Sequence, residues 1–347
     1  MKRRNTRTIT VGKLKIGSKH PVSIQSMLKT DISDICSAIA EARALEEAGC
    51  ELIRVAVKEK KILETLPVLK QNINIPICAD IHFDYKLAVE AIERGADKIR
   101  INPGNIKKPK EIRAIIDCAK ENKIPIRIGI NSGSTGSTKS SGMVKSLLEY
   151  LAHFERENFH NIIISIKSSD VKTTVDAYRK MALRCDYPFH LGLTSTGPVS
   201  RGKVKSSICI GALLLDGIGD TIRVSLTAGS KEEVASAKDI LSALDIRNFG
   251  PKIISCPTCG RCQVNLVSIV NELSDILQRS TANGQRPTTI AVMGCEVNGP
   301  GEAKHADIGI AFGKGKGAIF REGKIIKTVK AIDAVKEIMS EIKNFSF

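Results

Sequence analysis

Short apolar runs alternate with longer segments of helical periodicity from residue 20 to about residue 245. The helical segments, such as Asp31–Gly49, Asp84–Gly95 and Ser230–Leu244, repeat apolar residues at intervals of three and four. The short runs are rich in β-branched residues and predict strands. These runs are Val22–Met27, Leu52–Val57, Ile75–Ile81, Lys98–Asn102, Ile124–Ile130, Asn161–Lys167, Phe189–Thr194 and Thr221–Leu226. Strands that alternate with helices predict parallel pairing through right-handed crossovers.

The number and length of these units favour an α/β fold of the TIM (β/α)8 barrel type. Eight strand–helix units in about 225 residues match the size of such a barrel. An internal repeat agrees, because Gly49–Val55, Gly95–Ile101 and Gly219–Val224 each begin with a glycine suited to end a helix and continue into a strand with an arginine. A doubly wound open sheet is the alternative. The stretch Ile9–Ile16, with a turn at Gly12, predicts a hairpin that closes the bottom of the barrel.

The alternation stops near Asn248–Pro251, and a different order of elements follows. The pattern there predicts strands at Lys252–Ser255, Thr288–Met293 and Ile308–Phe312, a hairpin at Ala318–Val329, and helices at Val264–Arg279 and Ala331–Lys343. This order indicates a small α+β domain, ferredoxin-like in topology. We therefore expect two domains, residues 1–248 and residues 249–347.

Composition and charge narrow the choice of partners. The formal net charge is +16, but aromatic residues make up only 4% of the chain and Trp is absent, which leaves few platforms on which bases could stack. Much of the excess is surface lysine, as in Lys58–Lys61. No run of 18 or more apolar residues occurs, and the basic start leads into no apolar stretch. We expect a cytoplasmic protein with neither a nucleic-acid nor a membrane partner.

Ten cysteines in a chain without an export signal argue for a reducing compartment. Six of them are scattered in apolar segments, where a free thiol behaves as a small hydrophobic group. The other four are Cys256, Cys259, Cys262 and Cys295. Thiolates from two separate loops hold either structural zinc or an iron–sulfur cluster. Their spacing leaves both possibilities open.

Polar residues recur at the carboxyl ends of the predicted strands, where the active sites of barrel enzymes form. They are Arg54, Asp80, Arg100, Asn102, Arg127, Asn131, Lys167, Thr194, Arg223 and Ser225. Five cations at one barrel mouth would repel one another, so we expect a ligand with several negative charges, such as a phosphorylated small molecule. Asp80 and His82 form a candidate acid/base pair.

Several motifs together resemble the 4-hydroxy-3-methylbut-2-enyl diphosphate synthase family of the non-mevalonate isoprenoid pathway. They are Ile24–Met27, Ala79–His82, Ile99–Asn105, Arg127–Ser134, Ser255–Arg261 and Asn298–Ala303, in the same order over nearly the whole chain. The resemblance implies an oxidoreductase that converts 2-C-methyl-D-erythritol 2,4-cyclodiphosphate to the linear allylic diphosphate by two-electron reduction, ring opening and loss of water. It also implies a TIM barrel, a ferredoxin/sulfite-reductase-like domain with one 4Fe–4S cluster, a homodimer, and flavodoxin or ferredoxin as electron donor.

The resemblance assigns roles to individual residues of this chain. The cluster ligands would be Cys256, Cys259, Cys295 and Glu302, with Cys262 as a bystander. The catalytic pair stays the one that the residues themselves suggest, Asp80 and His82. The substrate-binding residues would be Arg54, Arg100, Asn102, Arg127, Asn131, Lys167, Arg223 and Ser225.

Two departures from the family pattern matter for the reaction. Ser195 in Thr194–Gly197 stands where the family has a glutamate thought to act as an acid, and a serine cannot replace a carboxyl proton donor. Leu28-Lys29 replaces a usual Thr-Asn pair. One alternative is therefore a cluster-containing homologue with lost or altered activity. Another, less favoured, is a zinc-stabilised basic protein that binds nucleic acid.

Overall fold

The computed structural model describes residues 2–134, 137–280, 289–297, 301 and 306–345, and the chain forms two compact units. The first unit spans residues 1–247 and the second spans residues 248–347. Each unit has its own sheet and its own core.

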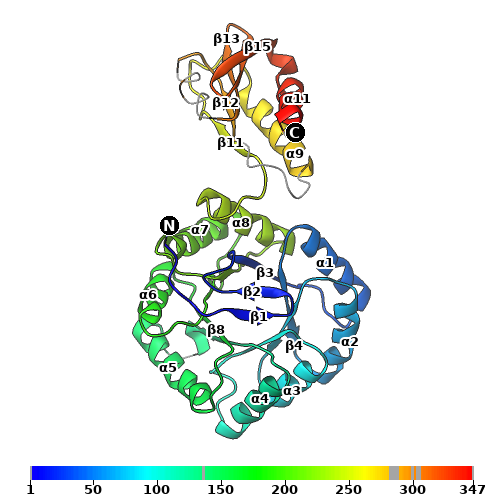
Figure 1. The fold of residues 1–347 in the computed structure, drawn as a ribbon, viewed down its shortest axis with the longest axis vertical. Helices are drawn as coiled ribbons and strands as arrows, with labels where there is room; N and C mark the ends of the chain where they lie inside the picture. Colours follow the sequence, from blue (N-terminus) through cyan, green and yellow to red (C-terminus); the bar gives the residue numbers. More distant parts are fainter. Residues whose placement is uncertain (1, 135–136, 281–288, 298–300, 302–305, 346–347) are drawn as a thin grey trace. The chain divides into compact units, whose positions relative to one another are not determined.

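The first unit is a barrel of parallel strands (Figure 1). Its strands are β3 (Ser23–Met27), β4 (Leu52–Val57), β5 (Ile77–Ile81), β6 (Lys98–Ile101), β7 (Ile126–Asn131), β8 (Ile162–Lys167), β9 (His190–Leu191) and β10 (Thr221–Ile222). Their order is β8-β7-β6-β5-β4-β3-β10-β9, and a parallel bridge between Ile164 and Phe189 joins the two ends. The predicted TIM barrel is confirmed, and the doubly wound open sheet is rejected.

The last two barrel strands are shorter than the sequence pattern predicts. Gly192 lies so close to the next strand that a Cβ there would stand 2.4 Å from the carbonyl oxygen of Arg223. Its φ of +152° also takes the chain out of ordinary strand geometry. The chain thus leaves the ladder at this point, and Thr194 and Ser225 lie in loops at the mouth rather than in strands.

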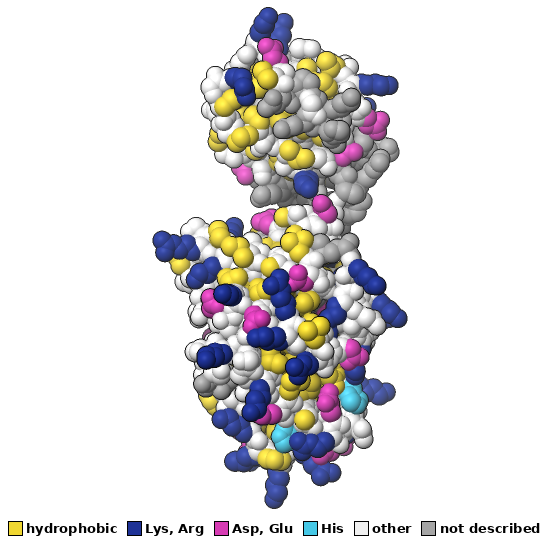
Figure 2. Space-filling view, turned by 90° about the vertical axis from the view of Figure 1, so that its left-hand side faces the viewer, with side chains coloured by type: hydrophobic (Ala, Val, Ile, Leu, Met, Phe, Trp, Pro, Cys, Tyr) yellow, Lys and Arg dark blue, Asp and Glu magenta, His cyan; other side chains and the backbone are white. Residues whose placement is uncertain are grey.

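Helices form the outer ring of the barrel (Figure 1). They are α1 (Ile35–Glu47), α2 (Lys60–Gln71), α3 (Tyr85–Glu93), α4 (Pro109–Glu121), α5 (Ser140–Arg156), α6 (Val171–Ala182), α7 (Val199–Leu215) and α8 (Ser230–Ala243). Asp34, Asp84 and Asp170 cap the first turns of α1, α3 and α6 by accepting backbone N–H bonds. On the face drawn in Figure 2, Lys and Arg side chains are scattered among acidic and hydrophobic ones and form no continuous basic surface.

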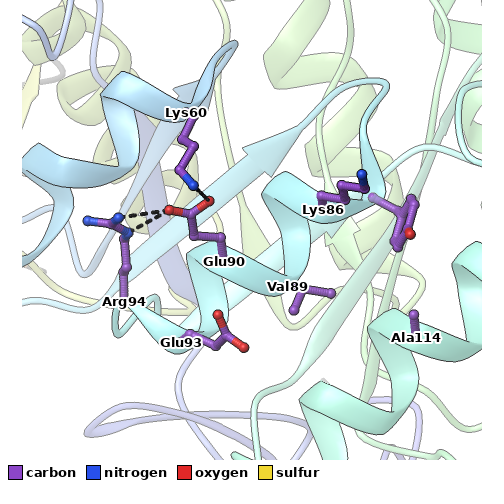
Figure 3. Close-up of a pocket in the computed structure, with 8 residues that line it drawn as sticks. Lys60, Lys86, Val89, Glu90, Glu93, Arg94 and Ala114 are labelled. Atoms are coloured by element: carbon purple, nitrogen blue, oxygen red, sulfur yellow. Dashed lines mark hydrogen bonds and ion pairs between the residues drawn. The ribbon is translucent and has the colours of Figure 1, made fainter.

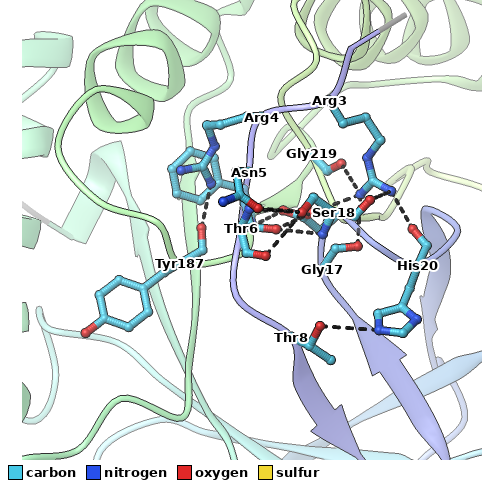
Figure 4. A network of polar contacts seen from close by, with 12 residues as sticks. Arg3, Arg4, Asn5, Thr6, Thr8, Gly17, Ser18, His20, Tyr187 and Gly219 are labelled. Atoms are coloured by element: carbon cyan, nitrogen blue, oxygen red, sulfur yellow. Dashed lines mark hydrogen bonds and ion pairs between the residues drawn. The ribbon is translucent and has the colours of Figure 1, made fainter.

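An N-terminal hairpin covers the bottom of the barrel, as predicted. Strands β1 (Ile9–Val11) and β2 (Leu14–Ile16) pair around Gly12 and pack on Leu52, Cys78 and Ile163 near the amino ends of the barrel strands. Arg3 donates to the carbonyls of Gly17, Ser18, His20 and Gly219 (Figure 4). It also pairs with Asp220 at 2.9 Å. Thr6 also donates to the buried Asp220 at 3.0 Å. These contacts fix the first residues of the chain to the loop before β10.

The second unit is α+β, as expected. Strands β11 (Lys252–Ser255), β12 (Thr289–Met293) and β13 (Ile308–Gly313) are parallel, whereas β14 (Lys316–Arg321) and β15 (Lys324–Lys330) continue the sheet antiparallel. Helix α9 (Leu266–Ser280), the short η2 (Ala331–Asp333) and α11 (Ala334–Phe345) complete it, and both α-helices pack on one face of the sheet. The strands lie in chain order, which differs from the interleaved order of a ferredoxin-like unit, because α9 connects two directly adjacent parallel strands.

Candidate functional site

A cavity of about 330 Å³ opens at the carboxyl ends of the barrel strands. Seven of the predicted substrate-binding residues line it: Arg54, Arg100, Arg127, Asn131, Lys167, Arg223 and Ser225. They come from β4, β6, β7, β8 and the loop after β10, so the barrel brings together side chains that are far apart in the sequence. Asn102 is buried but turned toward its own loop, where its Oδ1 accepts from the N–H of Gly104 at 3.0 Å.

Asp80 on β5 is fully buried and holds the arginines of the neighbouring strands. Its carboxylate accepts from Arg54 at 2.9 Å and from Arg100 at 3.1 Å, and the Nε2 of His82 lies 3.6 Å away. Burial alone would raise the pKa of Asp80, but Arg54 and Arg100 outweigh burial and lower the pKa to about 2. Asp80 is therefore ionised at neutral pH and orients two guanidinium groups at the cavity.

Glu233 is a second buried carboxylate at the mouth, and the sequence reasoning missed it. It pairs with Arg223 at 3.3 Å and with Lys29 at 3.1 Å, and it accepts from the N–H of Leu226 at 2.9 Å. Lys29 also lines the cavity and donates to the carbonyl of Leu226 at 3.2 Å. Lys29, which replaces a usual asparagine in the family motif, is thus a sixth cation of the cavity.

Positive charge exceeds negative charge at this mouth. Six cations line the cavity, and among the described residues only Asp80 and Glu233 form ion pairs with them. Burial and the nearby Arg54 lower the pKa of Arg127 to about 9, and burial together with Arg127 lowers the pKa of Lys167 well below its usual value. Each of these groups would be stabilised by an anion, which supports the predicted phosphorylated ligand.

A polar layer lies beneath the cavity, inside the barrel. Lys98 and His190 are fully buried, and neither Lys98 Nζ nor His190 Nε2 has a hydrogen-bond partner in the described part of the chain. Arg127 donates to Gln25 Oε1 at 3.3 Å in the same region. Burial lowers the pKa of Lys98 to about 7. Lys98 and Arg100 are two residues apart on β6, and side chains two apart in a strand point to the same face, here the inside of the barrel.

Replacing Lys98 should make the protein more stable and change how its stability depends on pH. Between about pH 7 and 10.5 the unfolded lysine binds more protons than the folded one, so the free energy of unfolding rises with pH. In Lys98→Met we expect this slope, up to about 1.4 kcal/mol per pH unit, to disappear. Urea unfolding at several pH values measures it. The exposed Lys110→Met is the control, and an equal slope in wild type and Lys98→Met would contradict the prediction.

The loop that departs from the family pattern also borders the cavity. Thr194, Ser195 and Thr196 line it, and Ser195 is exposed with a φ of +52°. Thr196 is buried and donates to the carbonyl of Ser225, which joins this loop to the one after β10. Ser195 therefore borders the space in which a substrate would lie.

A second hollow, of about 540 Å³, lies on the outside of the barrel along α3 (Figure 3). Glu90, one of the acidic residues that line it, already pairs with Lys60 at 3.4 Å and with Arg94 at 2.8 Å. It has no excess of charge comparable with that of the mouth. We do not assign it a function.

The cysteines of the second unit lie at the carboxyl edge of its parallel strands. Cys256 follows β11 and Cys295 follows β12, and the register pairs Ser255 with Val292, so both thiols lie at the same edge. The N–H of Gly294 donates to Cys256 Sγ at 3.3 Å. Cys259 is exposed and Cys295 is buried. Glu302 lies outside the described residues.

The donors at this edge suit an iron–sulfur cluster. Within the described residues no three His, Cys, Asp or Glu side chains already converge on one point. A Cβ on Gly294 would come within 2.5 Å of Cys262 Sγ and 3.4 Å of Cys256 Sγ, so two sulfurs lie directly against this glycine. Thiolates are the ligands that such clusters take. The residue types fit the group.

Comparison with known proteins agrees with both units. The GcpE TIM-barrel domain matches residues 6–238, and the GcpE protein C-terminal domain matches residues 252–344. A protein of Thermodesulfovibrio yellowstonii is 50% identical to this chain, and the match covers 99% of each of the two chains. One of Geobacillus thermodenitrificans is 46% identical over 98% of this chain and 92% of its own. Both are named 4-hydroxy-3-methylbut-2-en-1-yl diphosphate synthase (flavodoxin).

Solved structures resemble the barrel at low sequence identity. A 3-dehydroquinate dehydratase from Geobacillus kaustophilus has a TM-score of 0.53 and 15% identity, and it covers 70% of this chain and 98% of its own. A dihydropteroate synthase from Xanthomonas albilineans has a TM-score of 0.53 and 12% identity, and the match covers 69% of this chain and 97% of that protein. These likenesses show the fold alone. In the described residues no helix is long and apolar enough to span a membrane. The family matches over both units confirm the resemblance seen in the motifs: the chain belongs to the GcpE family.

Proposed function

We propose that this enzyme carries out the reductive ring opening and dehydration of 2-C-methyl-D-erythritol 2,4-cyclodiphosphate to 4-hydroxy-3-methylbut-2-enyl diphosphate, a step of isoprenoid biosynthesis. The observation that carries the proposal is the cavity lined by six cations, which fits a substrate with two phosphoryl groups. Relatives of nearly equal length that bear this name support it. Ser195 is the one feature that favours the alternative, a homologue with lost or altered activity.

The barrel, residues 1–248, would bind the substrate. Arg54, Arg100, Arg127, Lys167 and Arg223 would hold the diphosphate, and Asn131 and Ser225 would add neutral hydrogen bonds. Asp80 fixes the directions of Arg54 and Arg100 before the substrate arrives. Such preorganisation lowers the cost of orienting the ligand.

Proton transfer must be arranged without the glutamate that the family usually has. Asp80, with a pKa of about 2, holds no proton at neutral pH and so cannot donate one. We assign to Asp80 the task of holding charge and to His82, 3.6 Å from it, the proton transfer at the mouth. Ser195 would bind a water molecule beside the departing oxygen, as its exposed position on the cavity allows.

The second domain, residues 249–347, would hold one 4Fe–4S cluster through Cys256, Cys259, Cys295 and Glu302. The cluster would pass the two electrons of the reaction one at a time. Glu302 would hold its iron less tightly than the three thiolates hold theirs, as suits a catalytic rather than a purely structural metal centre. Flavodoxin, which the relatives' names print, or ferredoxin would deliver the electrons. We further propose a cytoplasmic homodimer without a nucleic-acid or membrane partner; ten free cysteines agree with a reducing compartment.

Purification without oxygen, followed by iron and sulfide analysis and turnover of the cyclodiphosphate with a chemical reductant, tests the proposal. We expect about four irons per chain and formation of the allylic diphosphate. Glu302→Ala should lower cluster retention, whereas Glu272→Ala, an exposed residue of α9, should not. A cluster-bearing protein that leaves the substrate unchanged would favour the altered homologue. A colourless zinc protein would reject the mechanism.

A further inference from the structure

The structure places Cys262 beside Cys256, and the proposed ligand set does not explain this. A Cβ on Gly294 would lie 2.5 Å from the Sγ of Cys262 and 3.4 Å from the Sγ of Cys256. The two sulfurs therefore border the same glycine. The Gly294 N–H donates to Cys256 Sγ at 3.3 Å, which fixes that sulfur in place.

The local backbone explains why Cys262 turns toward β12. The N–H of Cys262 donates to the carbonyl of Cys259 at 2.9 Å, which closes a turn after the Cys256–Cys259 segment. The N–H of Gln263 then donates to the carbonyl of Gly294 at 3.2 Å, which ties the turn to the loop after β12. Cys262 and Cys256 are both half-buried against the core of this domain, whereas Cys259 is exposed. Cys259 lies between the other two in the sequence with the same spacing of three to each, yet its sulfur is not among the atoms beside Gly294.

We propose that Cys256 and Cys262 are a peroxide-sensitive thiol pair, which closes to a disulfide when the cluster is lost and withholds one cluster ligand until it is reduced. The oxidant is hydrogen peroxide. One sulfur attacks the peroxide, the O–O bond breaks, and a sulfenic acid and water form. The second sulfur then displaces the sulfenic oxygen as a second water. One S–S bond has formed, two thiol protons have left with the oxygens, and two electrons have passed to the peroxide.

This inference rests on the proposed function only in calling Cys256 a cluster ligand. The disulfide itself is a property of two neighbouring thiols. A disulfide that forms reversibly would protect Cys256 from oxidation to sulfinic or sulfonic acid, which cells do not generally reverse. The cluster could then be rebuilt after reduction by a thiol.

Trypsin separates the two thiols, which makes the pairing directly measurable. It cleaves after Lys252, Arg261 and Arg279, so Cys256 and Cys259 share peptide 253–261 and Cys262 lies on peptide 262–279. The full chain is freed of iron with a chelator, reduced, treated with hydrogen peroxide, alkylated and digested without reductant. We expect peptides 253–261 and 262–279 to be joined in most of the protein, and to remain joined in Cys259→Ser but not in Cys256→Ser.

The same sample is then supplied with iron and sulfide, with or without prior reduction by a thiol. We expect cluster absorbance to return only after reduction. A disulfide confined to peptide 253–261, or a link that survives in Cys256→Ser, would overturn the pairing. Equal cluster recovery with and without reduction would show that the disulfide does not withhold Cys256 from the cluster. The peptide map does not depend on which metal centre the chain holds, so it stands or fails separately from the proposed function.

Discussion

Replacing Arg127 with methionine should weaken substrate binding and, at the same time, stabilise the protein. Arg127 is almost fully buried, and burial with the neighbouring Arg54 lowers its pKa to about 9. Without an anion, the folded protein bears the cost of burying this charge, and a methionine of similar length removes that cost. We expect the free energy of unfolding to rise by about 1 to 3 kcal/mol. Loss of a charge-assisted hydrogen bond to phosphate should raise the dissociation constant about 10- to 100-fold.

Calorimetric titration with the cyclodiphosphate and urea unfolding of the ligand-free protein measure the two effects. Arg113→Met is the matched control, because Arg113 lies on the outer face of α4 with its side chain 67% exposed. It should change neither quantity by more than about 0.5 kcal/mol. A less stable Arg127→Met that binds substrate normally would assign Arg127 to the fold rather than to the ligand.

Replacing Asp80 with asparagine should have the opposite effect on stability. The asparagine has nearly the same shape but no charge, so Arg54 and Arg100 would lose the carboxylate that they share. Removing one partner of a buried ion pair costs about 3 to 5 kcal/mol. The exposed Asp117→Asn on α4 should be neutral. In the double variant Asp80→Asn/Arg100→Met, part of the loss should be recovered, because one unpaired charge is gone; strict additivity would contradict the direct coupling.

The free energy of unfolding should also depend on pH in a way that shows the titration of Asp80. The pKa of Asp80 in the folded protein, about 2, lies below its ordinary value of 3.8, so the folded protein releases the proton more readily than the unfolded chain. Its contribution is complete above about pH 4 and is lost as the pH falls toward 2. We expect wild type to lose about 2 kcal/mol more than Asp80→Asn across this window. Parallel curves would reject an ionised Asp80.

The sequence predicted the barrel because hydrophobic periodicity and repeated glycine–strand units are local signals. It also predicted the arginines of the mouth, since the carboxyl ends of parallel strands must meet. The burial of two further residues, Glu233 and Lys98, could also have been predicted from their spacing in the sequence. Glu233 is spaced from Ala237, Ile240 and Leu241 as one buried helix face requires, and all four are buried in α8. Lys98 shares a strand face with Arg100.

Other features depend on distances that no local pattern contains. Lys29 pairs with Glu233 at 3.1 Å although the two are 204 positions apart in the chain. Pairing of the first barrel strand, β3, with the last, β10, brings them together. Motif spacing favours Cys256 and Cys259 as a pair, but the turn after Cys259 sends Cys262 to Gly294 instead. The order of strands in the second sheet likewise follows from how α9 crosses over, and element order alone does not determine it.

The N-terminal hairpin has a consequence for how the chain folds during synthesis. Arg3 and Thr6 are synthesised well before their partner Asp220, which follows 217 and 214 positions later. At about 5 to 20 residues per second, roughly 10 to 40 seconds pass before those contacts can form. The hairpin itself packs on Leu52, Cys78 and Ile163, so its apolar side chains stay exposed until those strands have been made. A segment that is made early is therefore among the last to dock, because its partner Asp220 is made only just before the last barrel strand.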